Sequence, residues 1–111
     1  MKKVYNKLVR DKIPEIIKLD NCKPTIRTLD SKEFLSELFK KMAEEAEEFV
    51  KAKDNKEEVM KEITDIYEII DTVIRLYGLD KNDILALQEK RRDERGSFKN
   101  MVYLESVDEN K

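Results

Sequence analysis

Five acidic residues in two short groups are the part of this chain best suited to carry chemistry. Glu44, Glu45 and Glu48 form the pattern E-E-x-x-E, and Glu62 and Asp65 form E-x-x-D after a gap of thirteen residues. Residues three apart share one face of a helix, so each group would present its carboxylates together. Ligand sets made only of oxygen favour Mg²⁺ or Mn²⁺ over zinc. The spacing therefore predicts a divalent-cation site built from two helices.

Glu45 occupies a position where an apolar residue is expected. Together with Leu38, Met42 and Phe49 it follows the four- and three-residue steps of one buried helical stripe. Burying an ionised carboxylate is costly unless it is paired or bound to a metal. Carboxylates that face inward also repel one another, and a divalent cation would relieve that repulsion.

The acidic residues also have a plainer interpretation. Glutamate forms helices well, and 43% of the chain is charged, so acidic pairs spaced by three arise by chance. Glu57 and Glu58, for example, fall in the first turn of a helix, where they complement its dipole. A non-catalytic helical module whose acidic face binds a basic partner is therefore an alternative, although it leaves the register of Glu45 unexplained.

Composition excludes several other kinds of chemistry. The 111 residues include no histidine, one cysteine (Cys22) and two glycines, which removes His-ligated zinc, Cys–His nucleophiles and glycine-rich phosphate loops. A net charge of −2 argues against a nucleic-acid polymer as partner. No apolar run approaches the ~18 residues of a membrane span, and no signal peptide is evident. We therefore expect no membrane partner and a cytoplasmic location, which the single cysteine also fits.

Hydrophobic periodicity predicts an all-α fold in one domain over residues 1–111. Asp30 or Ser31 would cap the first long helix, Gly78 would end the second, and Asp80 and Gly96 would bound the last. The expected elements are a short helix near Pro14–Leu19, long helices over about 31–52 and 56–77, a shorter helix over about 79–95, and an extended strand or arm at 101–104.

The apolar stripes of the two long helices are wider than one partner helix can bury. Their members are Phe34, Leu35, Phe39 and Val50 on the first helix and Ile69, Ile70, Val73 and Ile74 on the second. We therefore expect an antiparallel helical bundle whose four-helix core is completed by a second copy of the chain.

Two basic groups outside the acidic helices suit a phosphate ligand. They are Lys7, Arg10 and Lys12 near the N-terminus, and Lys90, Arg92 and Arg95 near the end of the last helix. Arginine matches phosphate oxygens with two parallel hydrogen bonds, and lysine supplies a point charge. A polyphosphate substrate needs both a metal–carboxylate site and such cations. A solvated face with salt bridges to Asp93 and Glu94 is the alternative for the C-terminal group.

The order and spacing of these motifs resemble the MazG-like nucleoside triphosphate pyrophosphohydrolases. These belong to the all-α NTP pyrophosphatase superfamily, with dimeric dUTPases and phosphoribosyl-ATP pyrophosphohydrolases as relatives. The resemblance covers about residues 5–98, from Y-N-K-L-V-R-D-K-I-P-E at Tyr5, through both acidic groups, to K-R-R-D-E-R-G-S-F at Lys90.

The resemblance implies a role for each of these residues. Glu45, Glu48, Glu62 and Asp65 match the Mg²⁺ ligands, with Mn²⁺ as a substitute. Glu44, Glu45 and Glu48 are the expected catalytic residues, and Glu44 would orient a ligand or the water. The residues expected at the phosphates are Lys7, Arg10, Lys12, Lys90, Arg92 and Arg95.

The resemblance also implies a reaction, the hydrolysis of a nucleoside triphosphate between its α and β phosphates. The products would be the monophosphate and pyrophosphate, the role would be house-cleaning of the nucleotide pool, and the enzyme would be a homodimer or homotetramer. A phosphoribosyl-ATP pyrophosphohydrolase of histidine biosynthesis would use the same metal cluster and is the alternative within this class. Nothing in the sequence identifies the base.

Overall fold

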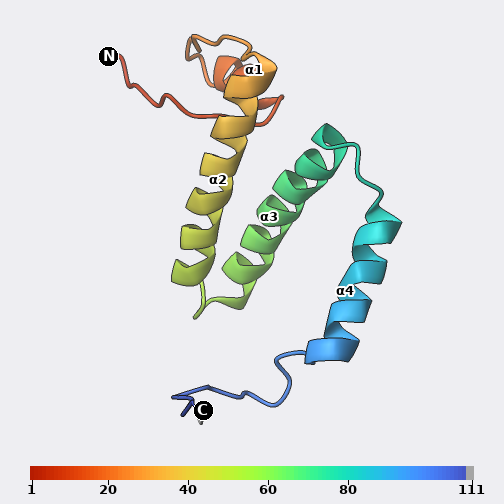
Figure 1. Cartoon of the computed structure of the whole chain (residues 1–111). Helices are drawn as coiled ribbons and strands as arrows, with labels where there is room; N and C mark the ends of the chain where they lie inside the picture. The colour runs from red at the N-terminus through yellow and green to blue at the C-terminus, as the bar shows by residue number, and fades with distance from the viewer. Residues whose placement is uncertain (110–111) are drawn as a thin grey trace. The chain divides into compact units, whose positions relative to one another are not determined.

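The chain folds into helices joined by loops, and no strand occurs in the part that the structure describes. The computed structural model describes residues 1–109. The helices are α1 (Ile13–Leu19), α2 (Ser31–Lys51), α3 (Lys56–Leu76) and α4 (Lys81–Arg95) (Figure 1). They confirm the predicted all-α fold, whereas residues 101–104 form neither helix nor strand.

The helices belong to two compact units. The first comprises Met1–Thr72 and the second begins at Val73, within the last turns of α3. The first unit contains both acidic groups and the N-terminal basic residues, and the second contains the C-terminal basic residues.

Side-chain caps determine where α2 and α3 begin. The carboxylate of Asp30 accepts a hydrogen bond from the backbone N–H of Glu33 at 2.8 Å, so Asp30, not Ser31, is the cap of α2. Asn55 caps α3 in the same way through the N–H of Glu58, at 3.1 Å. The loop of residues 52–55 between the two helices is short, and α2 and α3 therefore lie side by side in antiparallel directions (Figure 1).

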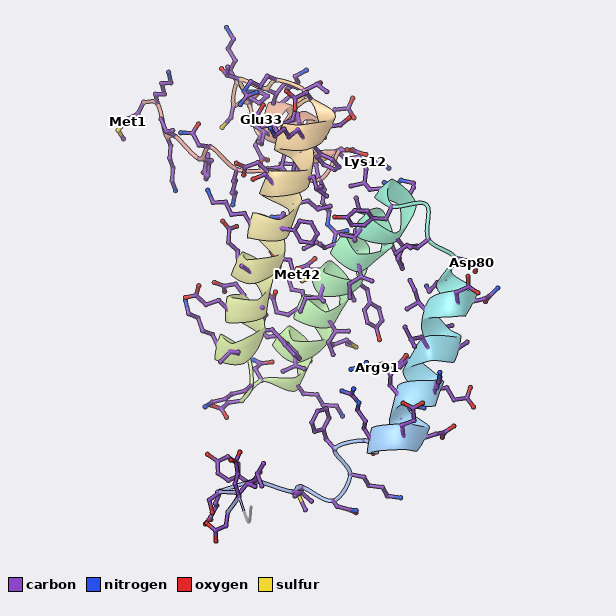
Figure 2. All side chains as sticks on the ribbon, in the orientation of Figure 1. Met1, Lys12, Glu33, Met42, Asp80 and Arg91 are labelled. Atoms are coloured by element: carbon purple, nitrogen blue, oxygen red, sulfur yellow. The ribbon has the colours of Figure 1, made fainter. Side chains whose placement is uncertain are left out.

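The contact between α2 and α3 buries few side chains. Leu38 on α2 and Ile69 on α3 are the buried apolar residues of the described chain, at 4% and 5% exposed. Glu62, two turns before Ile69 on α3, is buried as well, at 9% exposed. Figure 2 shows side chains from both helices in the space between them.

The burial on α3 differs from the expected stripe in one respect. The sequence pattern places Ile69 and Ile70 together on the stripe, yet Ile69 is 5% and Ile70 is 40% exposed. The apolar arc of α3 is broad, and only one side of it can face α2. That side carries Glu62 and Ile69, and these two residues of α3 are therefore buried.

Several large apolar side chains of α2 and α3 are left exposed in the first unit. They are Phe39, Phe49, Val50, Met60, Tyr67 and Ile70. The hairpin of α2 and α3 therefore does not enclose an apolar core by itself.

In the second unit, α4 is bounded by the residues that the sequence indicates. Asp80, which is labelled in Figure 2, accepts a hydrogen bond from the N–H of Asn82 at 2.8 Å, and the helix therefore starts at Lys81, not at Leu79. Gly78 and Gly96 have positive φ angles of 61° and 84°, a conformation that favours glycine after a helix end. None of the helices described is both long enough and apolar enough to span a membrane.

Candidate functional site

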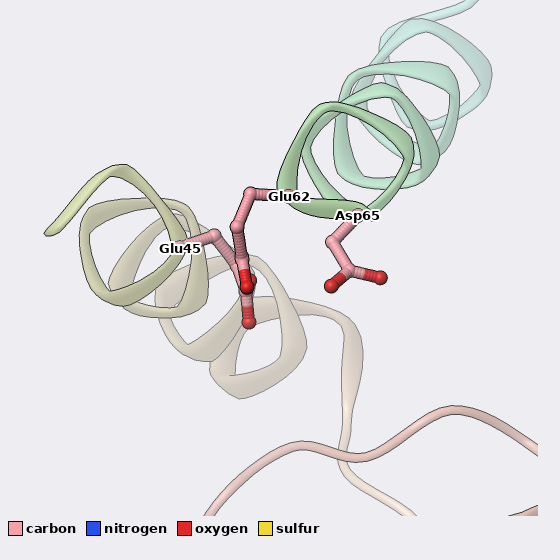
Figure 3. Close-up of side chains that lie close together, drawn as sticks. All are labelled: Glu45, Glu62 and Asp65. Atoms are coloured by element: carbon pink, nitrogen blue, oxygen red, sulfur yellow. The ribbon is translucent and has the colours of Figure 1, made fainter. Parts of the chain in front are cut away.

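Three of the acidic side chains meet between α2 and α3. Glu45 comes from α2, and Glu62 and Asp65 lie one turn apart on α3. One carboxylate oxygen from each lies within 4.8 Å of the other two. Figure 3 shows that Glu45 and Glu62 point toward one another, with Asp65 beside them. We refer to Glu45, Glu62 and Asp65 as the carboxylate cluster.

Glu62 is the most deeply buried member of the carboxylate cluster. Its Oε2 atom is buried and finds no hydrogen-bond partner among residues 1–109. A hydrogen bond shared with Glu45, then burial, then the negative charges of Glu45, Asp65 and Glu48 raise the pKa of Glu62 to about 7. Each of these causes disfavours the ionised form, and a cation at the cluster would favour it.

Cationic side chains contact the other two members of the cluster. Arg10 Nη2 donates a hydrogen bond to Asp65 Oδ1 at 2.6 Å. Lys41 Nζ lies 3.8 Å from Glu45 Oε1, one helical turn away on α2. The residues predicted from the sequence do not include Lys41. Its position four residues before Glu45 on the same helix nevertheless indicates an ion pair.

Glu44 and Glu48 lie beside the cluster and are exposed. Glu48 Oε1 lies 3.8 Å from Lys51 Nζ, and the Glu48 side chain is 57% exposed. Its charge nevertheless contributes to the raised pKa of Glu62. Of the four expected metal ligands, the structure therefore brings three together and leaves Glu48 at the solvent side.

A hollow of about 250 Å³ adjoins Glu62 at the end of the hairpin. Its lining residues are Glu48, Lys51, Ala52, Asn55, Glu58 and Glu62. Glu58, which the sequence explained by the helix dipole alone, therefore also faces the hollow that Glu62 and Glu48 share.

The carboxylate cluster fits a hard divalent cation. All its donors are carboxylate oxygens, the set that Mg²⁺ and Mn²⁺ prefer. Glu62 Oε2 is a buried oxygen without a hydrogen-bond partner among residues 1–109, and a bound cation would give it one. Glu45, Glu62 and Asp65 are the residues that would hold the ion.

The N-terminal basic residues lie in the same unit as the cluster. Arg10 contacts it through Asp65. Lys7 Nζ lies 5.5 Å from the centroid of the Tyr5 ring, and Lys12 immediately precedes α1.

The C-terminal basic residues Lys90, Arg92 and Arg95 lie on α4, in the second unit. Lys90 Nζ lies 3.9 Å from Glu94 Oε1, one of the salt bridges expected for a solvated helix face.

A comparison with protein families gave a match. Residues 9–92 match the family described as phosphoribosyl-ATP pyrophosphohydrolase. The matched part contains the whole carboxylate cluster, Arg10 and Lys90, and it leaves out Tyr5 and Arg95. No curated protein and no solved structure gave a significant match.

Proposed function

The chain belongs to the phosphoribosyl-ATP pyrophosphohydrolase family, and on this basis we propose that it hydrolyses a nucleoside triphosphate between the α and β phosphates. The family identifies the protein as a pyrophosphohydrolase that acts on a nucleotide. The proposal adds the substrate class, the products (a monophosphate and pyrophosphate) and a dependence on Mg²⁺. The observation that carries it is the carboxylate cluster, in which a buried Glu62 oxygen lacks a partner among the described residues.

In this proposal Glu45, Glu62 and Asp65 hold Mg²⁺, and Mn²⁺ can replace it. The bound ion would neutralise charge on the phosphate oxygens and lower the pKa of the attacking water. Glu44 and Glu48, exposed on α2 beside the cluster, are the carboxylates that we assign to orienting that water. Their exposure leaves them accessible to a ligand that approaches from solvent.

Of the basic residues that we assign to the phosphates, Arg10 is the one that contacts the carboxylate cluster. Its hydrogen bond to Asp65 brings a guanidinium group to the edge of the cluster. A guanidinium group can exchange a carboxylate for a phosphate because both accept two parallel hydrogen bonds. Lys7, Lys12, Lys90, Arg92 and Arg95 complete the proposed set.

Phosphoribosyl-ATP is the second candidate substrate, and the family match favours it. Its hydrolysis would break the same bond and need the same cluster. The two candidates differ in the role of the enzyme, which is nucleotide house-cleaning in the first case and histidine biosynthesis in the second.

A second copy of the chain is also part of the proposal. The apolar side chains left exposed on α2 and α3 would be covered in a homodimer, or in a homotetramer built from two such dimers. The four-helix core expected from the sequence would then form from two hairpins.

A nucleotide panel with Mg²⁺ tests the function. Purified protein is incubated with nucleoside triphosphates and with phosphoribosyl-ATP, and the products are separated chromatographically. We expect pyrophosphate and the monophosphate. Release of inorganic phosphate with a diphosphate would overturn the assignment of the α–β bond, and higher kcat/KM for phosphoribosyl-ATP would select the second candidate. Absence of turnover on the whole panel would favour the non-catalytic acidic module.

A further inference from the structure

Two lysine side chains lie over the ring of Tyr5 in the N-terminal segment. Lys3 Nζ is 5.2 Å and Lys7 Nζ is 5.5 Å from the centroid of the Tyr5 ring. Asn6, between Tyr5 and Lys7, has a φ angle of 45°, a left-handed conformation that asparagine tolerates better than most residues. The segment is therefore bent at the position where it presents the ring.

The Tyr5 ring contributes little to the packing of the fold. Tyr5 is 61% exposed, whereas a large apolar ring that packs in a core would be buried. A nucleotide base that stacks on this ring takes the place of an ammonium group, and the displaced ammonium group can then contact the phosphates of the same ligand. Tyr5 with Lys3 and Lys7 thus combines the two chemical features that a nucleotide requires.

Arg10 connects this segment to the carboxylate cluster. Its hydrogen bond to Asp65 places the chain at the cluster at a point five residues after Tyr5. Five residues span at most about 18 Å when fully extended, so the Tyr5 ring stays within reach of a ligand whose phosphates lie at the cluster. Residues 1–12 carry five basic side chains and one acidic side chain, a net +4 in a chain of net −2.

We propose that residues 3–10 form a nucleotide-binding arm, in which Tyr5 stacks on the base and Lys3 and Lys7 contact the phosphates. This inference rests on the proposed function and deepens it, because it names a contact to the base. Tyr5 lies outside the residues that match the family. Residues 3–8 of the arm, with Lys3 and Lys7, lie outside that match, whereas Arg10 lies within it.

Substitution of Tyr5 separates base recognition from phosphate recognition. Stacking of a base on an aromatic side chain contributes enough affinity that Tyr5→Ala should raise the KM for the nucleotide about tenfold. Tyr5→Phe keeps the ring and should leave KM unchanged. Inhibition by tripolyphosphate, which has no base, should be equal in the wild type and in both variants. Tyr103, an exposed tyrosine of the C-terminal tail, provides the matched control Tyr103→Ala.

A fluorescence experiment tests the arm without turnover. The chain contains no tryptophan, so Tyr5→Trp introduces a single indole at the proposed contact. A triphosphate with a methylene group between the α and β phosphorus atoms should quench this indole, and tripolyphosphate should not. Tyr103→Trp is the control and should respond to neither ligand.

The outcomes distinguish the arm from the function. If the protein releases pyrophosphate and Tyr5→Ala keeps the wild-type KM, the arm is wrong and the function stands. If no nucleotide on the panel is hydrolysed, the function fails, and the fluorescence result decides the arm alone. An indole at position 5 that ignores the nucleotide, or responds equally to tripolyphosphate, would overturn base stacking by Tyr5.

Discussion

Arg10 and Asp65 lie 55 positions apart in the sequence and are joined by a hydrogen bond of 2.6 Å. The pair attaches the N-terminal segment to α3 at the carboxylate cluster. Arg10 is 52% exposed and Asp65 29% exposed in this pair, so water competes with the contact. An exposed ion pair of this kind contributes only about 0–1 kcal/mol to stability.

The first prediction concerns Arg10→Ala. A hydrogen bond to a charged group is worth about 1.5–3 kcal/mol, so loss of the guanidinium group should raise the KM for the nucleotide about tenfold or more. The melting temperature should change little, because the pair is exposed. Steady-state kinetics and a thermal melt measure the two effects. Lys18→Ala, an exposed basic residue of α1, is the control. An unchanged KM in Arg10→Ala would remove Arg10 from the phosphate site.

The second prediction is that Mg²⁺ or Mn²⁺ stabilises the folded protein. An ion that binds only the folded state stabilises it by mass action, by about 2.7 kcal/mol at a hundred times its Kd. The melting temperature should rise with millimolar Mg²⁺, and EDTA should reverse the rise. Glu62→Ala should lose the response, because Glu62 carries the buried oxygen that lacks a hydrogen-bond partner within residues 1–109. An equal response in Glu62→Ala would show that the ion binds elsewhere.

The sequence predicted the helices and part of the cluster for identifiable reasons. Asp80 and Gly96 bound α4 because capping depends on local residue types. The intrusion of Glu45 into an apolar stripe also needs only the sequence, and the structure places its side chain at 17% exposed.

Other features depend on contacts that the sequence pattern does not specify. The side of α3 that faces α2 depends on how the helix is rotated about its axis, so the burial of Glu62 in place of Ile70 was not predictable from periodicity. Arg10 pairs with Asp65 because of the path that the irregular N-terminal segment takes, and the sequence pattern does not predict that path. Charge alone allows Arg10 many acidic partners in a chain with 25 acidic residues.

The third prediction concerns Glu45→Ala. Loss of a residue that only supports a metal ligand lowers activity by up to about a hundredfold. Loss of Glu45, a ligand itself, should therefore lower turnover by more than about a hundredfold. The helix should remain folded, since alanine has a high helix propensity. Removal of one negative charge beside Glu62 should also stabilise the metal-free protein. Activity assays and a thermal melt in EDTA measure these effects. Glu57→Ala, a first-turn residue of α3, should change neither, and normal turnover in Glu45→Ala would refute its assignment.

The fourth prediction is a pH dependence of stability in the metal-free protein. The pKa of Glu62 is raised from about 4.5 to about 7 in the folded state. Between these values the folded protein binds more protons than the unfolded chain, so the contribution of Glu62 to stability is full below pH 4.5 and is lost as the pH rises through 7.

The variant Glu62→Gln isolates this effect from other titrating groups. Glutamine stays neutral, so the melting temperature of the variant in EDTA should exceed that of the wild type at pH 8, with a smaller difference at pH 5. Mg²⁺ competes with the proton on Glu62, and the Mg²⁺-induced rise of the wild-type melting temperature should therefore grow from pH 5 to pH 8. A difference between variant and wild type that is the same at both pH values would contradict the raised pKa.

The last prediction concerns the apolar surface of the hairpin. Val50 and Ile70 are 66% and 40% exposed, on helices whose mutual contact buries only Leu38 and Ile69 among the apolar side chains described. Exposed apolar area of this extent is expected to be covered by association, and light scattering at micromolar concentration should give at least twice the 13.2 kDa of the chain. Ile70→Glu would place a charge in the covered surface and should shift the protein toward monomer, whereas Lys61→Glu, at an exposed polar position of α3, should not. If the carboxylate cluster needs only its own chain, monomeric Ile70→Glu will still respond to Mg²⁺ in a thermal melt. A wild type that scatters as a monomer would show that the hairpin is stable with this surface in water.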